Sequence, residues 1–170
     1  MEDELLNLEN LERVLTEFAD DVKANYVQLL KDGDHVYTGK LMENITIHVD
    51  SGQGEYVVSF DMEQYWKYLE EGVRGAANPT SPYKNPGWKA YPHILKWVQL
   101  KPVIPRPDSN GKIPSVKSLA YLITRSIVEN GTTPYGNLKE AKADALNIWR
   151  DRISEALGRD FENYIAKILP

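Results

Sequence analysis

The sequence predicts an α+β protein, with a long N-terminal helix, a small antiparallel β-sheet, C-terminal helices and long proline-rich loops. Apolar residues recur every three or four positions near the start of the chain and again after residue 115, as on helices with one buried face. Residues 45–60 instead alternate apolar and polar side chains, as a pair of half-buried strands does. Helix, strand pair and further helices is an α+β order.

Composition bounds the size and class of the protein. A chain of 170 residues favours a single domain, 1–170, with a core of its own. A formal charge of −5 argues against broad electrostatic binding of nucleic acid, and we interpret the Lys and Arg residues as scattered. The absence of cysteine excludes disulfides and thiolate metal sites. An acidic start argues against a secretory signal, and no apolar run approaches the roughly 20 residues of a membrane span, so no membrane partner is expected.

The first predicted element is an amphipathic helix over residues 5–31. Asn7 is its expected N-cap, and residues 32–34 end it. Its predicted buried stripe is Leu8, Leu11, Leu15, Phe18, Val22, Tyr26 and Leu29. We interpret this stripe as packing on the protein's own core, with a coiled coil to another subunit as the alternative.

A β-hairpin follows at about 45–60. Thr38 is expected to cap a short helical turn through Leu41 or Met42. The first strand is expected to begin at Ile45, a turn spans 51–54, and the second strand covers 56–60. His48 falls on the polar side of the first strand, far in sequence from the other histidines, so no metal site is predicted.

The next stretch, residues 65–75, reads Y-W-K-Y-L-E-E-G-V-R-G. Its dense aromatic content predicts a segment buried in the core, and Gly72 is placed to turn the backbone with positive φ. It leads into a proline-rich loop at about 75–91 that contains Tyr83 and Trp88. Trp88 has two interpretations, an interface anchor or a side chain that folds back onto its own core.

Three more helices are expected. Pro92 opens a short one that contains Trp97, and a second proline-rich loop at about 101–114 follows it. Ser115 caps the next helix, which ends at 130–131 and whose predicted stripe is Val116, Leu119, Ala120, Ile123 and Ile127. Asn137 caps a last helix to about Ile168, with a possible bend at Gly158. Its predicted stripe is Leu138, Ala141, Ala145, Ile148 with Trp149, Ile153 or Ala156, Leu157, Phe161, Ile165 and Ile168.

The sequence shows no pattern that predicts catalysis. It lacks a nucleophile elbow, a P-loop, a zinc-protease motif, an EF-hand and a dinucleotide-binding fingerprint. Glu70 and Glu71 are adjacent and would diverge on a regular element, so they do not form an acid–base pair. We interpret Asp61, Glu63 and Glu70 as a solvated acidic face. No catalytic residue, cofactor or metal is therefore predicted, and the chain is not expected to be an enzyme.

Three segments, taken in order, resemble the head–tail joining or tail-completion (neck) proteins of tailed bacteriophages. They are the opening helix L-L-N-L-E-N-L-E-R-V-L at 5–15, Y-T-G-K-L-M-E-N-I at 37–45 with the hairpin and the aromatic segment, and L-A-Y-L-I-T-R-S-I-V-E-N-G-T-T-P-Y-G-N-L at 119–138. The stretches I-L-K-W-V and K-P-V-I-P within 94–105 are also similar to that family. The chain departs from the family in its longer loop at 76–114 and in the residues that follow Pro134.

The resemblance implies a structural virion protein, assembled in the host cytoplasm, that forms a ring of six or twelve copies. It would contact portal or adaptor protein and tail proteins, while genomic DNA passes through the lumen without specific binding. Alternatives are a tail terminator or minor tail protein of related fold, a small metal-dependent hydrolase, or a monomeric host-directed adaptor. Candidate intersubunit residues are Arg74, Tyr83, Trp88, Trp97, Val103, Ile104, Arg106 and Tyr135, which lie in or beside the loops.

Overall fold

The computed structural model describes residues 8–33, 36, 39–52, 55–76, 78–79, 90–101, 105–107 and 109–169. It confirms the predicted α+β class, with a long N-terminal helix, a two-stranded antiparallel sheet and C-terminal helices. The chain divides into two compact units, Met1–Trp66 with Gly136–Pro170 (unit 1) and Lys67–Tyr135 (unit 2). The single domain expected from the sequence stays a prediction.

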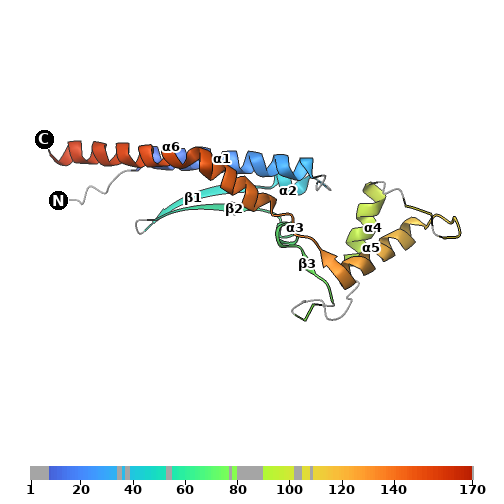
Figure 1. Ribbon diagram of the computed structural model, residues 1–170. Coiled ribbons are helices and arrows are strands. Elements are labelled where there is room, and N and C mark those ends of the chain that lie inside the picture. Colours follow the sequence, from blue (N-terminus) through green and yellow to red (C-terminus); the bar gives the residue numbers. More distant parts are fainter. Residues whose placement is uncertain are drawn as a thin grey trace. The chain divides into compact units, whose positions relative to one another are not determined.

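Unit 1 is built on two long helices, α1 (Glu9–Asp32) and α6 (Asn137–Ile168), which lie side by side (Figure 1). They are antiparallel, because the start of α1 contacts Asp160 while Asp21, further along α1, contacts Trp149. The buried apolar residues of the pair are Leu11, Val14, Ala19, Val22, Tyr26 and Leu30 from α1 and Leu138, Ala141, Ala145, Trp149 and Ala156 from α6.

The buried face of each helix differs in part from the predicted stripe. On α1, Leu11, Val22 and Tyr26 are buried as predicted, but the other predicted side chains are only half-buried: Leu8, Leu15, Phe18 and Leu29. Val14, Ala19 and Leu30, which were not part of the predicted stripe, are buried instead.

Helix α6 departs from its predicted stripe more strongly. Its buried positions end at Asp160, and four residues predicted to be buried are exposed: Ile148, Phe161, Ile165 and Ile168. The helix continues through Gly158 without a break. Asn137 is not the cap; it is the first helical residue, and Gly136, in the left-handed region with φ 68°, precedes it.

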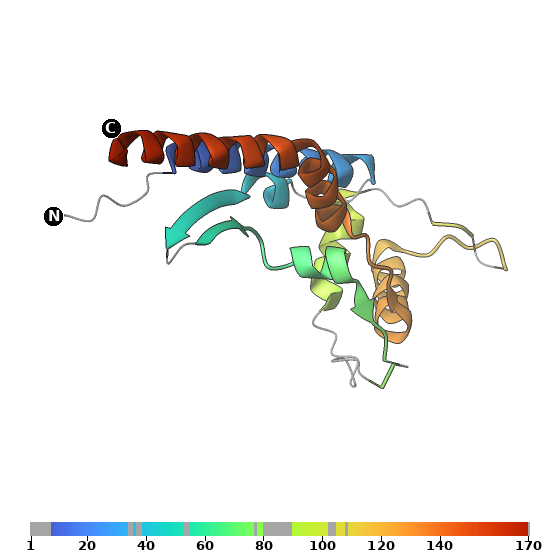
Figure 2. The same cartoon turned by 60° about the vertical axis from the view of Figure 1, so that its left-hand side comes forward.

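The hairpin of unit 1 confirms the predicted strands. After the short helix α2 (Lys40–Glu43), β1 (Thr46–Gly52) pairs antiparallel with β2 (Glu55–Asp61). Figures 1 and 2 show the hairpin along one side of α1, which contacts β1. The Lys23 ammonium donates to the Ile45 carbonyl oxygen at 2.8 Å and so ties α1 to the start of β1. The expected capping residue Thr38 lies outside the described residues, and Gly39 precedes α2 with φ 77°.

Unit 2 contains the helices α4 (Tyr91–Leu100) and α5 (Val116–Asn130), which pack on each other, and a short antiparallel pair, β3 (Val73–Arg74) with β4 (Gly131–Thr132). Pro92 lies in the first turn of α4, as predicted. The predicted cap of α5 is also confirmed, because the Ser115 hydroxyl oxygen accepts from the backbone N–H of Ser118 at 3.2 Å. Residues 105–107 and 109–114 form neither helix nor strand, which agrees with the predicted proline-rich loop.

The prediction of a buried aromatic segment at 65–75 is wrong. The segment forms a six-residue helix, α3 (Trp66–Glu71), none of whose residues is buried, and Tyr68 is 54% exposed. Successive helical residues are 100° apart, so Trp66 and Tyr68 cannot share one face. Tyr65 nevertheless has a structural contact, since its hydroxyl oxygen accepts from the backbone N–H of Leu41 at 3.1 Å. The positive φ expected at Gly72 is confirmed at 68°.

Candidate interaction surfaces

The first surface begins where Asp160 of α6 meets the start of α1. Helix α1 has no capping side chain of its own at Leu8. Asp160, which is 2% exposed, supplies the acceptors instead: its carboxylate accepts from the backbone N–H of Leu11 at 2.8 Å and from the backbone and side-chain nitrogens of Asn10 at 3.2 and 2.6 Å. An anion at this position also interacts favourably with the helix dipole. Asp160 therefore fixes how far α6 extends past the start of α1.

Tyr56 of β2 lies close enough to this site to sense its charge. Burial raises the pKa of the Tyr56 hydroxyl above its usual value of 10.0, and the negative charges of Glu12 and Asp160 raise this pKa further. Both carboxylates disfavour the tyrosinate because it carries the same charge sign. The tip of the hairpin, the first turn of α1 and the Asp160 turn of α6 are thus electrostatically linked.

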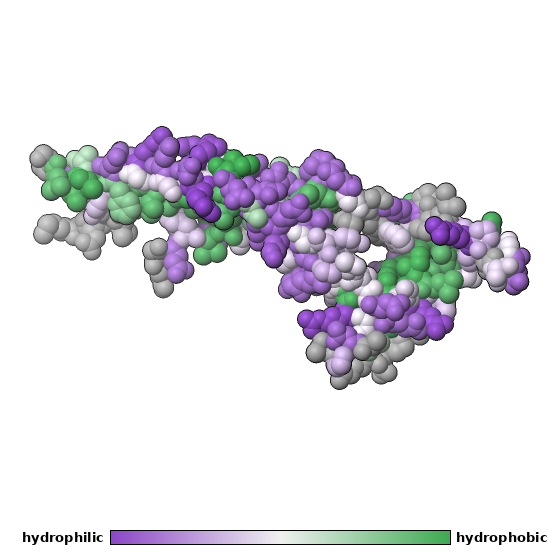
Figure 3. Space-filling model, viewed as in Figure 1, coloured by the Kyte–Doolittle hydropathy of each residue, from purple (hydrophilic) through white to green (hydrophobic). Residues whose placement is uncertain are grey.

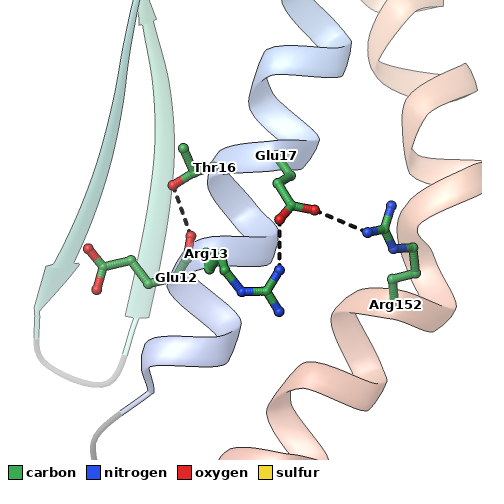
Figure 4. Close-up of polar contacts among 5 residues, drawn as sticks. All are labelled: Glu12, Arg13, Thr16, Glu17 and Arg152. Atoms are coloured by element: carbon green, nitrogen blue, oxygen red, sulfur yellow. Dashed lines mark hydrogen bonds and ion pairs between the residues drawn. The ribbon is translucent and has the colours of Figure 1, made fainter.

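A row of polar contacts along the helix pair fixes the same register. Figure 4 shows Glu17 between two guanidinium groups, those of Arg13 at 2.7 Å and Arg152 at 3.0 Å. The guanidinium carbon of Arg152 also lies 3.9 Å from the centre of the Trp149 ring. The Trp149 indole N–H donates to the Asp21 carboxylate at 2.9 Å. Exposed ion pairs contribute little stability. The contacts that join the two helices, Glu17 with Arg152 and Asp21 with Trp149, hold α1 and α6 in one alignment.

Beyond Asp160, the end of α6 carries an apolar stripe without a described partner from α1. Phe161, Ile165 and Ile168 share one helical face by their spacing of four and three residues, and they are 45%, 49% and 49% exposed. Figure 3 shows apolar residues gathered at this end of the helix. We call Phe161, Ile165, Ile168 and Leu169 the α6 apolar end.

In unit 2, glycines allow two short strands that are distant in sequence to pair closely. The Leu69 carbonyl oxygen accepts from the backbone N–H of Tyr135 at 2.9 Å, and the backbone N–H of Ala76 donates to Val128 at 2.7 Å. Gly131, with φ 79° and ψ −165°, lies in a region that only glycine readily adopts. A Cβ atom there would overlap the Val73 carbonyl oxygen. Arg74 and Tyr135, both exposed, lie on these two paired segments.

Helices α4 and α5 carry the second apolar surface. The buried side chains of α5 are Ala120, Thr124 and Val128. Val116, which was predicted to be buried, is exposed. Exposed aliphatic side chains here include Leu100 at the end of α4, Ile113 in the loop before α5, and Val116 and Leu122 on α5. We call these four residues the α4–α5 apolar surface. Figure 3 shows apolar residues gathered over this part of unit 2.

All eight residues predicted to form intersubunit contacts belong to unit 2. Of the four that the structure describes, Arg74, Arg106 and Tyr135 are exposed and Trp97 is half-buried on α4. The other four lie outside the described residues: Tyr83, Trp88, Val103 and Ile104. Their role in contacts between subunits stays a prediction.

The interpretation of Lys and Arg as scattered missed a segregation of charge that the sequence shows. Residues 41–66 contain five acidic side chains and neither Lys nor Arg: Glu43, Asp50, Glu55, Asp61 and Glu63. Residues 84–117 contain seven basic side chains and one acidic: Lys84, Lys89, Lys96, Lys101, Arg106, Lys112, Lys117 and Asp108. A count of charge by segment, in place of the total, would have found both.

In the part of the chain that the structure describes, no three His, Asp or Glu side chains are grouped so that they could hold a metal ion. Within the same residues, no helix combines the length and the apolar character needed to cross a membrane. Comparison of the chain with protein-family models, curated proteins and solved structures finds no match.

Proposed function

We propose that this chain is a ring-forming structural subunit of the neck of a tailed bacteriophage, a head–tail connector or tail-completion protein. The observation that carries the proposal is that each unit exposes apolar side chains where its helices have an apolar face, at the α6 apolar end and the α4–α5 apolar surface. Large apolar patches on a protein surface mark sites of association. A subunit of a closed ring needs two different surfaces, one for each neighbour.

The motifs that resemble the neck family support the proposal through their backbone geometry. Two of the three segments contain glycines with positive φ: the second contains Gly39 before α2 and Gly72 after α3, and the third contains Gly131 after α5. These glycines begin or end helices, and they allow β3 and β4 to pair closely in unit 2. The motifs that contain them therefore have structural roles in this chain. A resemblance based on such residues suits a protein whose function is architectural.

In the proposed particle, the ring lies between the capsid portal and the tail. Its partners are portal or adaptor protein on one side and tail proteins on the other, and the genome passes through its lumen. The net charge of −5 suits this passage, because a protein that neutralised many phosphates would bind DNA and retard it. The proposed role requires no catalytic step and no cofactor.

Replacement of Phe161 and Ile165 by serine tests the apolar end. We expect the double variant Phe161→Ser/Ile165→Ser to weaken self-association by about tenfold or more, since truncated aromatic and aliphatic anchors at interfaces commonly have effects of this size. Its monomer should keep its free energy of unfolding to within about 1 kcal/mol, because both side chains are already close to half exposed. Sedimentation velocity over a concentration series measures the association.

The matched control is Ala166→Ser, an exposed position on the same turn but outside the apolar stripe. This variant should associate as the wild type does. Equal association of all three proteins would show that the α6 apolar end takes no part in assembly.

A further inference from the structure

We propose that the acidic β1–β2 hairpin of one copy binds the exposed basic residues Lys96, Arg106 and Lys117, here called the basic segment, of the next copy in the ring. This inference rests on the proposed function, because it adds a charged contact between successive subunits to the apolar surfaces of that function. It joins one surface of unit 1 to a different surface of unit 2 in a neighbouring molecule. Such a head-to-tail contact generates a closed ring when the rotation between copies closes.

The hairpin offers one acidic face. Asp50, Glu55 and Asp61 are all exposed, and the strand register puts them on the same side of the two strands. The opposite side holds the half-buried residues Ile47, Val49, Tyr56, Val58 and Phe60. Residues 41–66 include neither Lys nor Arg, and His48 is the basic side chain that shares this face. Val57, which is also exposed, adds an apolar side chain among the carboxylates.

The facing surface has the opposite charge. Lys96 on α4, Arg106 in the loop and Lys117 on α5 are exposed, and none forms an ion pair with another residue that the structure describes. Lys117 follows Val116 directly, so basic groups border the α4–α5 apolar surface. An apolar centre with a charged border is the usual construction of a protein interface.

The charges of the chain favour a second copy over nucleic acid as the occupant of the basic segment. Lys96, Arg106 and Lys117 carry a formal charge of +3, and Asp50, Glu55 and Asp61 carry −3, so each copy supplies both halves of a complementary pair. Complementary potentials of this kind raise the association rate and fix the orientation of docking. A DNA duplex approaching the basic segment would also meet a chain whose net charge is −5.

Charge reversal with rescue in trans tests the contact. Asp50→Lys/Asp61→Lys changes the formal charge of the acidic face (Asp50, Glu55 and Asp61) from −3 to +1, because each Asp→Lys replacement adds two charges. Lys96→Glu/Lys117→Glu changes the formal charge of the basic segment (Lys96, Arg106 and Lys117) from +3 to −1 in the same way. We expect each variant alone to associate at least about tenfold more weakly than the wild type, because juxtaposed like charges strongly oppose docking. An equimolar mixture of the two variants should restore assembly with alternating copies, since each reversed surface then faces its complement. Restoration also shows that both variants are folded.

The control is Asp144→Lys/Asp151→Lys, which changes the charge of the exposed side of α6 by the same amount as the hairpin variant. It should assemble as the wild type does. Raising the salt from about 0.1 to about 1 M shortens the screening length from roughly 10 to roughly 3 Å. It should therefore weaken assembly of the wild type and of the mixture.

The outcomes separate this inference from the proposed function. Wild-type rings whose assembly is unaffected by both reversals would overturn the charge contact and leave the ring standing, and so would a mixture that fails to recover. A wild-type chain that forms no ring would overturn the proposed function and this inference with it. Tight retention of a random-sequence DNA duplex that Lys96→Glu/Lys117→Glu abolishes, with assembly unchanged, would assign the basic segment to nucleic acid and overturn the proposal.

Discussion

Replacement of Asp160 by alanine is expected to lower the free energy of unfolding of unit 1 by about 3 kcal/mol. The substitution removes three hydrogen bonds to a charged acceptor, two of them from the backbone N–H groups of the first turn of α1. Loss of a helix cap costs about 0.5–2 kcal/mol, and donors that remain buried without a partner add about 1–3 kcal/mol. Chemical denaturation followed by circular dichroism measures the total effect.

Hydrogen exchange at the amides of Asn10 and Leu11 shows whether the effect arises at this site. Both amides should lose protection in Asp160→Ala before the rest of α1 does, while Asp160→Asn should have an intermediate effect because it keeps one oxygen acceptor and loses the charge. The control Asp151→Ala, on the exposed side of α6, should change stability by less than about 0.5 kcal/mol. Unchanged protection at both amides would mean that Asp160 does not cap α1.

Replacement of Gly131 by alanine is expected to destabilise unit 2 by about 3 kcal/mol or more. The backbone conformation at Gly131 is disfavoured by about 1–3 kcal/mol for a residue with a side chain. In addition, the new Cβ would overlap the Val73 carbonyl oxygen, and β3 and β4 would have to separate. Thermal and denaturant unfolding of the full chain, with hydrogen exchange of α5 as the readout specific to unit 2, measures the loss.

Gly158→Ala provides the opposite expectation within the same protein. Gly158 lies inside α6, and a Cβ there meets no atom within 4 Å. Alanine should therefore stabilise the helix by about 0.5–1 kcal/mol. If Gly131→Ala were tolerated as well as Gly158→Ala, the close pairing of β3 with β4 would not exist in solution.

Local signals predicted the elements of this fold well. The helix ends at Gly33 and Gly131, the Ser115 cap, Pro92 in the first turn of α4 and the alternation along β1 all depend on neighbours in the sequence, and all are confirmed. The Asp160 cap could not be predicted in this way. Its partners lie about 150 positions away, and an aspartate within a helix has the pattern of a solvated residue.

Hydrophobic periodicity predicted the helical faces but not the partner that covers them. The apolar stripe of α6 continues to Ile168, yet α1 begins beside Asp160, so the final turns remain exposed. Val116 also belongs to a predicted apolar stripe, that of α5, and it is exposed as well. Aromatic density was a poor guide to burial at 65–75, because a six-residue helix distributes its aromatic side chains over several faces. For the interaction surfaces, total charge concealed the segregation of acidic and basic residues.

The central claim, that this chain assembles into a closed ring, is tested most directly by native mass spectrometry combined with negative-stain imaging of the purified protein. The proposal predicts a single dominant assembly, six or twelve copies by its resemblance to the neck family, that appears in images as a ring with a central opening. A strict monomer at the highest attainable concentration, with no ring in any image, would contradict the proposal.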